Sequence, residues 1–261
     1  MPGENGTLAA ERLARAAPDG QTLGIAVPTH VIGSLLDDPP RYDPIADFAP
    51  VALFARNPLV LAVSNALGVN SLQAFIAIAK SRPGELTYGA SAVGGGPHLA
   101  ALLFCDKAGI QLHMRVYSET NTLYEDLTAG RIALTFNNTM SALPLAQAGK
   151  LTILGSTTLT RSPANPALRT LAETALPGYD IGSWVGLLAP AATPEAVVSR
   201  INAAASRTVE TPAVRQQLQA LGIEPVSEMP GYFATHLRSE WARWAPFVRD
   251  HPDAFPGARR R

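Results

Sequence analysis

Short apolar runs alternate with segments whose apolar residues recur at helical spacing along most of the chain. Each apolar run has the length of a strand, and we predict strands at 22–27, 51–55, 59–63, 86–89, 112–117, 132–136, 151–157 and 184–189. Helices are predicted at 7–17, 71–81, 97–108, 123–129 and 141–148, with two more opening at Thr193-Pro194 and Thr211-Pro212. This alternation predicts an α/β fold with mainly parallel sheets.

In such sheets, ligands bind beyond the carboxyl ends of the strands. The loops to inspect are therefore those that join a strand to a helix, and they begin near Pro28, Ala90, Ser118 and Asn137. Near the end of the chain, apolar side chains recur at helical spacing and predict a packing face, at Phe233, Leu237, Trp241 and Trp244. The last segment, 251–261, is predicted to be a disordered tail.

Composition narrows the classes of function. The 261 residues carry 21 basic and 21 acidic side chains, so no long-range field attracts nucleic acid, and any anion must be held by local donors. The single cysteine, Cys105, lies in an apolar segment and is predicted to be a buried structural thiol. No apolar run is long enough to span a membrane, and residues 1–7 have no signal-peptide pattern.

The loop from Ser91 to His98 carries the most specific local signal. It joins a predicted strand to a helix, and its glycines, Gly94, Gly95 and Gly96, allow the backbone to approach an anion at the helix N-terminus. The alternative is a tight turn that needs positive φ angles. The loop is neither a phosphate-binding Walker loop nor a dinucleotide fingerprint, because the required spacing is absent.

The histidine in this loop, His98, lies in the first helical turn, where the helix dipole opposes protonation. We therefore interpret His98 as a neutral, positioning side chain. The pair Ser91 and His98 leaves open a serine esterase, although the G-x-S-x-G nucleophile elbow is absent.

Asn137 and Asn138 follow a predicted strand, and their amides suit either ligand recognition or helix capping. The acidic pairs Asp37-Asp38 and Glu125-Asp126 are interpreted as solvated. No histidine spacing matches a metal site, and no cofactor is predicted.

Several ordered motifs resemble the Bug family of tripartite tricarboxylate transporter substrate-binding proteins, from about Asn5 to Arg249. They are Asn5-Gly6-Thr7, Ala14 to Gly20, Tyr42-Asp43-Pro44, Asp47 to Pro50, Tyr88 to Leu99, Leu143-Pro144, Ala148 to Leu151, Leu176 to Tyr179, Ser183-Trp184 with Gly186, Ala189-Pro190 and Thr193-Pro194.

This resemblance implies a type II periplasmic binding-protein fold, in which two α/β lobes close over a small organic acid without catalysis. The first lobe would combine 1–63 with 186–250, and the second would span 64–185. The implied partners are the organic acid and the membrane components of a tripartite tricarboxylate transporter, with the receptor a monomer.

By matched position, the resemblance implies that the ligand contacts Thr29 and His30 in the first lobe. In the second lobe it implies contacts with Ser91, Gly94, Gly95, Gly96, His98 and Asn137. Asn137 stands where many members have aspartate, which could pair with a positive group of the ligand. We therefore expect a ligand that carries no essential positive charge at that point. The serine or threonine common near Gly95 is missing, as is a basic or glycine position near Ser118-Glu119.

Family members also begin with a signal peptide and a first strand-helix-strand unit, and this chain starts after the matching positions. The first lobe is therefore expected to be incomplete, with an exposed sheet edge. The expected compartment is the periplasm by resemblance, or the cytoplasm if translation starts at Met1. A misassigned start and a truncated, nonfunctional copy are both open. A third alternative is a sensor, because the effector lobes of some transcription regulators share this fold.

Overall fold

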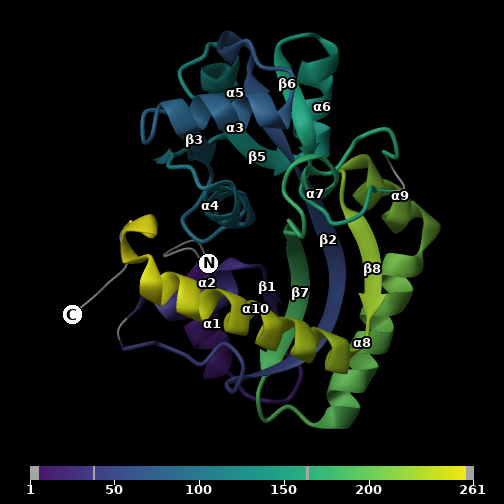
Figure 1. Cartoon of the computed structure of the whole chain (residues 1–261). Helices are drawn as coiled ribbons and strands as arrows, with labels where there is room; N and C mark the ends of the chain where they lie inside the picture. Colours follow the sequence, from purple (N-terminus) through teal and green to yellow (C-terminus); the bar gives the residue numbers. More distant parts are fainter. Residues whose placement is uncertain (1–5, 38, 163–164, 257–261) are drawn as a thin grey trace. The chain divides into compact units, whose positions relative to one another are not determined.

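The computed structural model describes residues 6–37, 39–162 and 165–256. The chain forms two compact units. Unit 1 comprises Met1–Arg56 and Trp184–Arg261, and unit 2 comprises Asn57–Ser183. The chain passes between them in two strands, β2 (Phe48–Ser64) and β7 (Gly182–Pro190) (Figure 1). The chain crosses from one unit to the other between Arg56 and Asn57 and again between Ser183 and Trp184. From the sequence, these two boundaries are predicted at 63 and 186.

Unit 1 is built on antiparallel pairs. The strand β1 (Gly24–Ala26) pairs with β7, with Gly24 opposite Leu188, and β8 (Glu224–Glu228) pairs with the first part of β2. Its helices are α1 (Thr7–Ala14), α2 (Thr29–Leu36), α8 (Glu195–Glu210), α9 (Pro212–Ala220) and α10 (Pro230–Asp250), followed by a 3₁₀ turn at Pro252–Ala254. The main core cluster joins Phe48 and Leu53 to Trp184, Phe233 and Leu237.

Unit 2 contains a mixed sheet. The strand β3 (Thr87–Ala90) runs parallel to β4 (His113–Val116) and to β5 (Leu134–Asn138). The second part of β2 runs antiparallel to β5 and to β6 (Leu151–Ser156). The helices are α3 (Leu72–Ser81), α4 (Gly96–Ala108), α5 (Thr120–Thr128), α6 (Thr139–Gln147) and α7 (Leu171–Thr174), with a 3₁₀ turn at Asn65–Leu67. Because β3, β4 and β5 are parallel, their carboxyl ends lie at one edge of the sheet.

The α/β class is confirmed, but the prediction of mainly parallel sheets was wrong. The segments predicted as separate strands at 51–55 and 59–63 form the single strand β2, which continues through Pro58. The pairings of β2 with β5, β6 and β8 are antiparallel. A strand that passes through both units cannot be recognised from apolar runs, because the half-buried residues between the runs break the pattern.

Three further expectations need correction. Residues after Pro28 form the helix α2 rather than a loop. Phe233, Leu237 and Trp244 are buried as predicted, but Trp241 is 43% exposed. The predicted tail is ordered at its start, where Phe255 is 2% exposed, and its remainder, 257–261, lies outside the described residues.

Asp126 is not the solvated acid that the sequence suggested. It is buried, and it accepts hydrogen bonds from Tyr117 Oη at 2.6 Å and Arg131 Nε at 2.6 Å. Arg115 adds an ion pair at 2.9 Å. The hydrogen bond from Tyr117 and the two guanidinium groups hold the pKa of Asp126 below its usual value. This network fixes the segment that follows β4 against α5.

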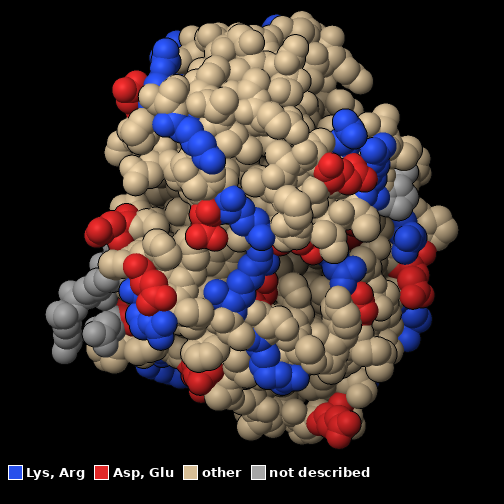
Figure 2. Space-filling view, in the orientation of Figure 1, with Lys and Arg blue, Asp and Glu red and all other residues tan. Residues whose placement is uncertain are grey.

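Charged side chains are interspersed on the face that Figure 2 shows, and the two signs form no single large patch there. This agrees with the zero net charge. Among the helices of the described part of the chain, none is long and apolar enough to cross a lipid bilayer.

The contact between Gly186 and Phe233 allows a sharp test of the unit 1 core. A Cβ at Gly186 would lie 2.1 Å from Phe233 Cζ, and the Phe233 ring is fully buried. We expect Gly186→Ala to lower the free energy of unfolding by about 2 kcal/mol through overpacking. Urea denaturation measures the loss. Gly231→Ala is the matched control, because a Cβ there meets no atom within 4 Å. Equal stability of the two variants would contradict the packing described.

Candidate functional site

The loop predicted from the sequence lies at the carboxyl edge of the parallel strands in unit 2. The strand β3 ends at Ala90, and α4 begins at Gly96 with Gly95 as its N-cap and Pro97 in its first turn. Proline fits there because its missing N–H would have no intrahelical acceptor. The loop immediately precedes this helix, so the N-terminal, positive end of the helix dipole faces the loop. The helix is thirteen residues long.

The three glycines do not play one role. Gly94 has φ of +76°, so the turn that the sequence left as an alternative is real at this position. Its N–H donates to His98 Nδ1 at 2.9 Å, and the N–H of Gly95 donates to the carbonyl of Ala92 at 3.3 Å. Gly96 heads the helix, where an N–H lacks an intrahelical acceptor. Gly96 is therefore the glycine of this loop whose N–H donates to no acceptor among the described residues.

His98 is fully buried and its ring stacks on Tyr88, with centroids 6.3 Å apart. Because its Nδ1 accepts the Gly94 N–H, the ring is in the tautomer without a proton on Nδ1. His98 thus fixes the shape of the loop. No hydrogen bond between the described atoms joins it to Ser91, whose side chain is exposed.

Asn137 reaches the same edge as the loop, because β5 lies beside β3. Asn137 and Asn138 are the last residues of β5 rather than a segment after it. Asn138 caps α6, and its Oδ1 accepts the Ser141 N–H at 2.8 Å. Asn137 Oδ1 accepts the N–H of Asn138 at 2.9 Å, which leaves the Nδ2 group as a donor. Capping therefore falls to Asn138, and Asn137 keeps an Nδ2 donor that no described residue accepts.

The sequence did not single out Ser183 as a site residue. An ideal Cβ built at Gly96 would lie 3.0 Å from Ser183 Cβ and 3.4 Å from Ser183 Oγ. The two positions are far apart in sequence, and an isolated serine beside a tryptophan in a strand gives no local signal for this contact.

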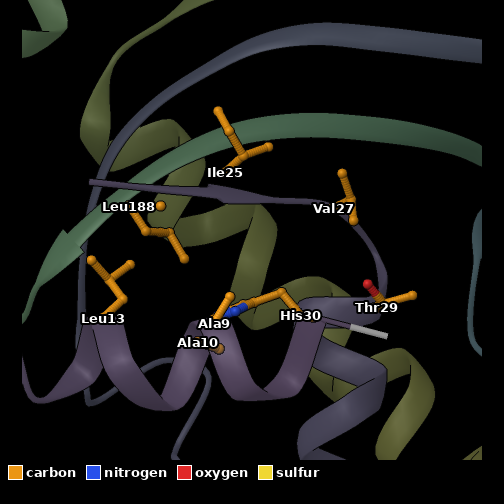
Figure 3. A pocket seen from close by; sticks show the side chains of 10 residues that line it. Ala9, Ala10, Leu13, Ile25, Val27, Thr29, His30 and Leu188 are labelled. Carbon is orange, nitrogen blue, oxygen red and sulfur yellow. The ribbon is translucent and has the colours of Figure 1, made fainter. Parts of the chain in front are cut away.

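Unit 1 contains a separate cavity beside the other two predicted residues, Thr29 and His30. Its volume is about 170 Å³. Side chains of α1, β1, α2 and β7 surround it, and they are mostly apolar (Figure 3). Ile25, in the three-residue strand β1, lines this cavity, and the residue is 65% exposed. Sequence reasoning missed Ile25 and Leu188 as cavity residues, because their strands pair only in the tertiary structure.

His30 is held from several sides. Its Nε2 donates to the carbonyl of Pro44 at 3.0 Å, and its own carbonyl accepts from Tyr42 Oη at 2.7 Å. The ring lies against Tyr42 and edge-on to Phe48. Burial lowers the pKa of His30 to about 4, so the ring is neutral at pH 7. Thr29 begins α2 and remains partly accessible.

The comparisons with known proteins agree with this architecture. Residues 1–251 match the model of the family described as "Tripartite tricarboxylate transporter family receptor". A protein of Rhodopseudomonas palustris, Rpa4515, solved with adipate, is 34% identical with a TM-score of 0.83, over 95% of this chain and 84% of its own. MatC of the same species, solved with bound malate, is 31% identical with a TM-score of 0.81, over 95% and 86%.

Relatives identified by sequence belong with the same family of receptors. BugT of Bordetella pertussis is 30% identical over 95% of this chain and 77% of its own length. A protein from the tcbD-tcbE intergenic region of Pseudomonas sp. strain P51 is 30% identical over 95% and 74%. Together the fold and these relatives define a solute-binding receptor with two α/β units. The chain belongs to the tripartite tricarboxylate transporter receptor family.

The buried state of His30 predicts a pH dependence. Its pKa of about 4 lies below the ordinary value near 6.5, so the unfolded chain binds the proton more readily. Stability from this group is therefore present above pH 6.5 and lost as the pH falls toward 4. Between pH 7 and 5 we expect a loss of about 2 kcal/mol from His30.

Denaturant unfolding of His30→Gln should show a loss of unfolding free energy between pH 7 and 5 that is smaller than in the wild type by about 2 kcal/mol. This difference does not depend on the stability of the variant at pH 7. His251→Gln, at an exposed position, is the control and should keep the wild-type loss. An unchanged loss in His30→Gln would mean that His30 is not buried as a neutral group.

Proposed function

We propose that this protein binds a small organic carboxylate and, acting as a monomer in the periplasm, presents it to the membrane components of a tripartite tricarboxylate transporter. Family membership supports this proposal, as do the adipate and malate named for two relatives that are more than 30% identical. A 32% identical solved structure is titled "Structure of a periplasmic transporter", which supports the compartment.

The observation that carries the proposal is the head of α4. The amide of Gly96 and the helix dipole provide a positive end at the carboxyl edge of β3, while Ser91 adds an accessible hydroxyl. Asn137, at the end of the neighbouring strand β5, offers an amide donor. These neutral donors suit a carboxylate, and they need no positive side chain.

The same geometry favours binding without catalysis. A serine esterase would need His98 within hydrogen-bond reach of the Ser91 hydroxyl. Instead, His98 is buried and its Nδ1 is occupied by the N–H of Gly94. The loop thus holds the histidine in a positioning role.

Isothermal calorimetry tests the proposal directly. The chain should bind adipate or malate, or another member of a panel of small dicarboxylates and aromatic carboxylates, with one site per molecule. The corresponding diamides should not bind, because the positive end of α4 requires a charge. A chromogenic ester should not be hydrolysed faster by the wild type than by Ser91→Ala. Absence of binding to every acid, or ester turnover that depends on Ser91, would overturn the proposal.

The charge at position 137 gives a second test. A carboxylate in Asn137→Asp would repel an anionic ligand and replace the amide donor by an acceptor, so affinity for the bound acid should fall at least about tenfold. Asn121→Asp adds the same charge at an exposed position on α5 and serves as the control. Equal losses in the two variants would indicate a general charge effect and would remove Asn137 from the site.

A further inference from the structure

We infer that the Ser183 hydroxyl is a ligand-positioning donor, which completes the carboxylate site at the head of α4 from outside the glycine loop. This inference rests on the proposed function and assigns a role to a residue that the loop sequence does not contain. It starts from the contact between Gly96 and Ser183, which belong to the same unit.

The loop by itself supplies few donors. The N–H groups of Gly94 and Gly95 are used inside the loop, by His98 and by Ala92. Pro97 has no N–H. A carboxylate has two oxygen atoms with about four acceptor positions, so the Gly96 amide alone would leave most of them without a donor. The Ser91 hydroxyl and the Asn137 amide of the proposed site add two donors, and at least one acceptor position of the carboxylate still remains for a further donor close to Gly96.

Ser183 is placed to provide that donor. Its Oγ lies 3.4 Å from the point where a Gly96 Cβ would stand, and its Cβ lies 3.0 Å from the same point. The Ser183 hydroxyl makes no hydrogen bond with any of the described residues, and its side chain is only partly covered. It fills the space that a side chain at position 96 would need. Glycine at 96 and serine at 183 thus form a complementary pair.

The backbone around Ser183 is held on both sides. Two residues earlier, the N–H of Ile181 donates to the carbonyl of Thr157 at 2.9 Å. A Cβ at Gly182 would lie 3.4 Å from the carbonyl oxygen of Asn57, so this strand runs close to β2. On the other side, Trp184 is 2% exposed. A donor fixed in this way loses little freedom when a ligand binds.

The test compares Ser183→Ala with Ser239→Ala, a matched change at an exposed serine of α10. Calorimetry with the acid that the wild type binds should show affinity about tenfold lower for Ser183→Ala, as expected for one hydrogen bond to a charged group. Ser239→Ala should bind as the wild type does. The melting temperatures of all three proteins should agree, which separates loss of a donor from loss of fold.

A swap of the two side chains gives the decisive measurement. Gly96→Ser alone should bind poorly, because its Cβ would lie 3.0 Å from Ser183 Cβ. Combining Gly96→Ser with Ser183→Gly removes this clash and returns one hydroxyl to the same place, so affinity should recover to within about threefold of the wild type. If the wild type binds no carboxylate, both proposals fail. If it binds and Ser183→Ala binds equally well, or the swap does not recover affinity, only the role of Ser183 is refuted.

Discussion

The structure depends on β2, a seventeen-residue strand that takes part in the sheets of both units. Its first part pairs with β8 in unit 1, and its second part pairs with β5 and β6 in unit 2. Buried N–H and C=O groups need partners, so each part of β2 must pair within the sheet of its own unit. In unit 2, β5 in turn pairs with β3, and this order brings Asn137 and the loop after Ala90 to the same edge.

The site that we propose at that edge relies on local donors, because the chain has no net charge to concentrate anions. A helix terminus and neutral hydrogen-bonding groups bind an anion without requiring a buried cation. The Nδ1 atom of His98 accepts a loop amide, so this ring shapes the turn and the proposed site requires no charge on it. In the proposed site, ligand binding and the shape of the loop thus depend on different residues of one short segment.

Much of the local structure of the candidate site could be predicted from the sequence, because strand ends and helix starts have local signatures. The loop from Ser91 to His98 was found through its glycines and Pro97, and Asn137 through its place after an apolar run. The different roles of the three glycines could not be predicted, because they follow from hydrogen bonds to His98 and Ala92. Likewise, Asp126 looked solvated in sequence, and only the approach of Arg115, Tyr117 and Arg131 makes its burial possible.

The sequence by itself determined the α/β class, most helices and strands, the glycine loop and, through ordered motifs, the family. Those features depend on short-range periodicity, capping and turn chemistry, which neighbouring residues fix. The tertiary structure alone decided that β2 is continuous, that its pairings with β5, β6 and β8 are antiparallel, and that Ser183 lies against Gly96. Strand direction and such a contact depend on residues distant in sequence, and no local pattern of apolar and polar positions encodes them.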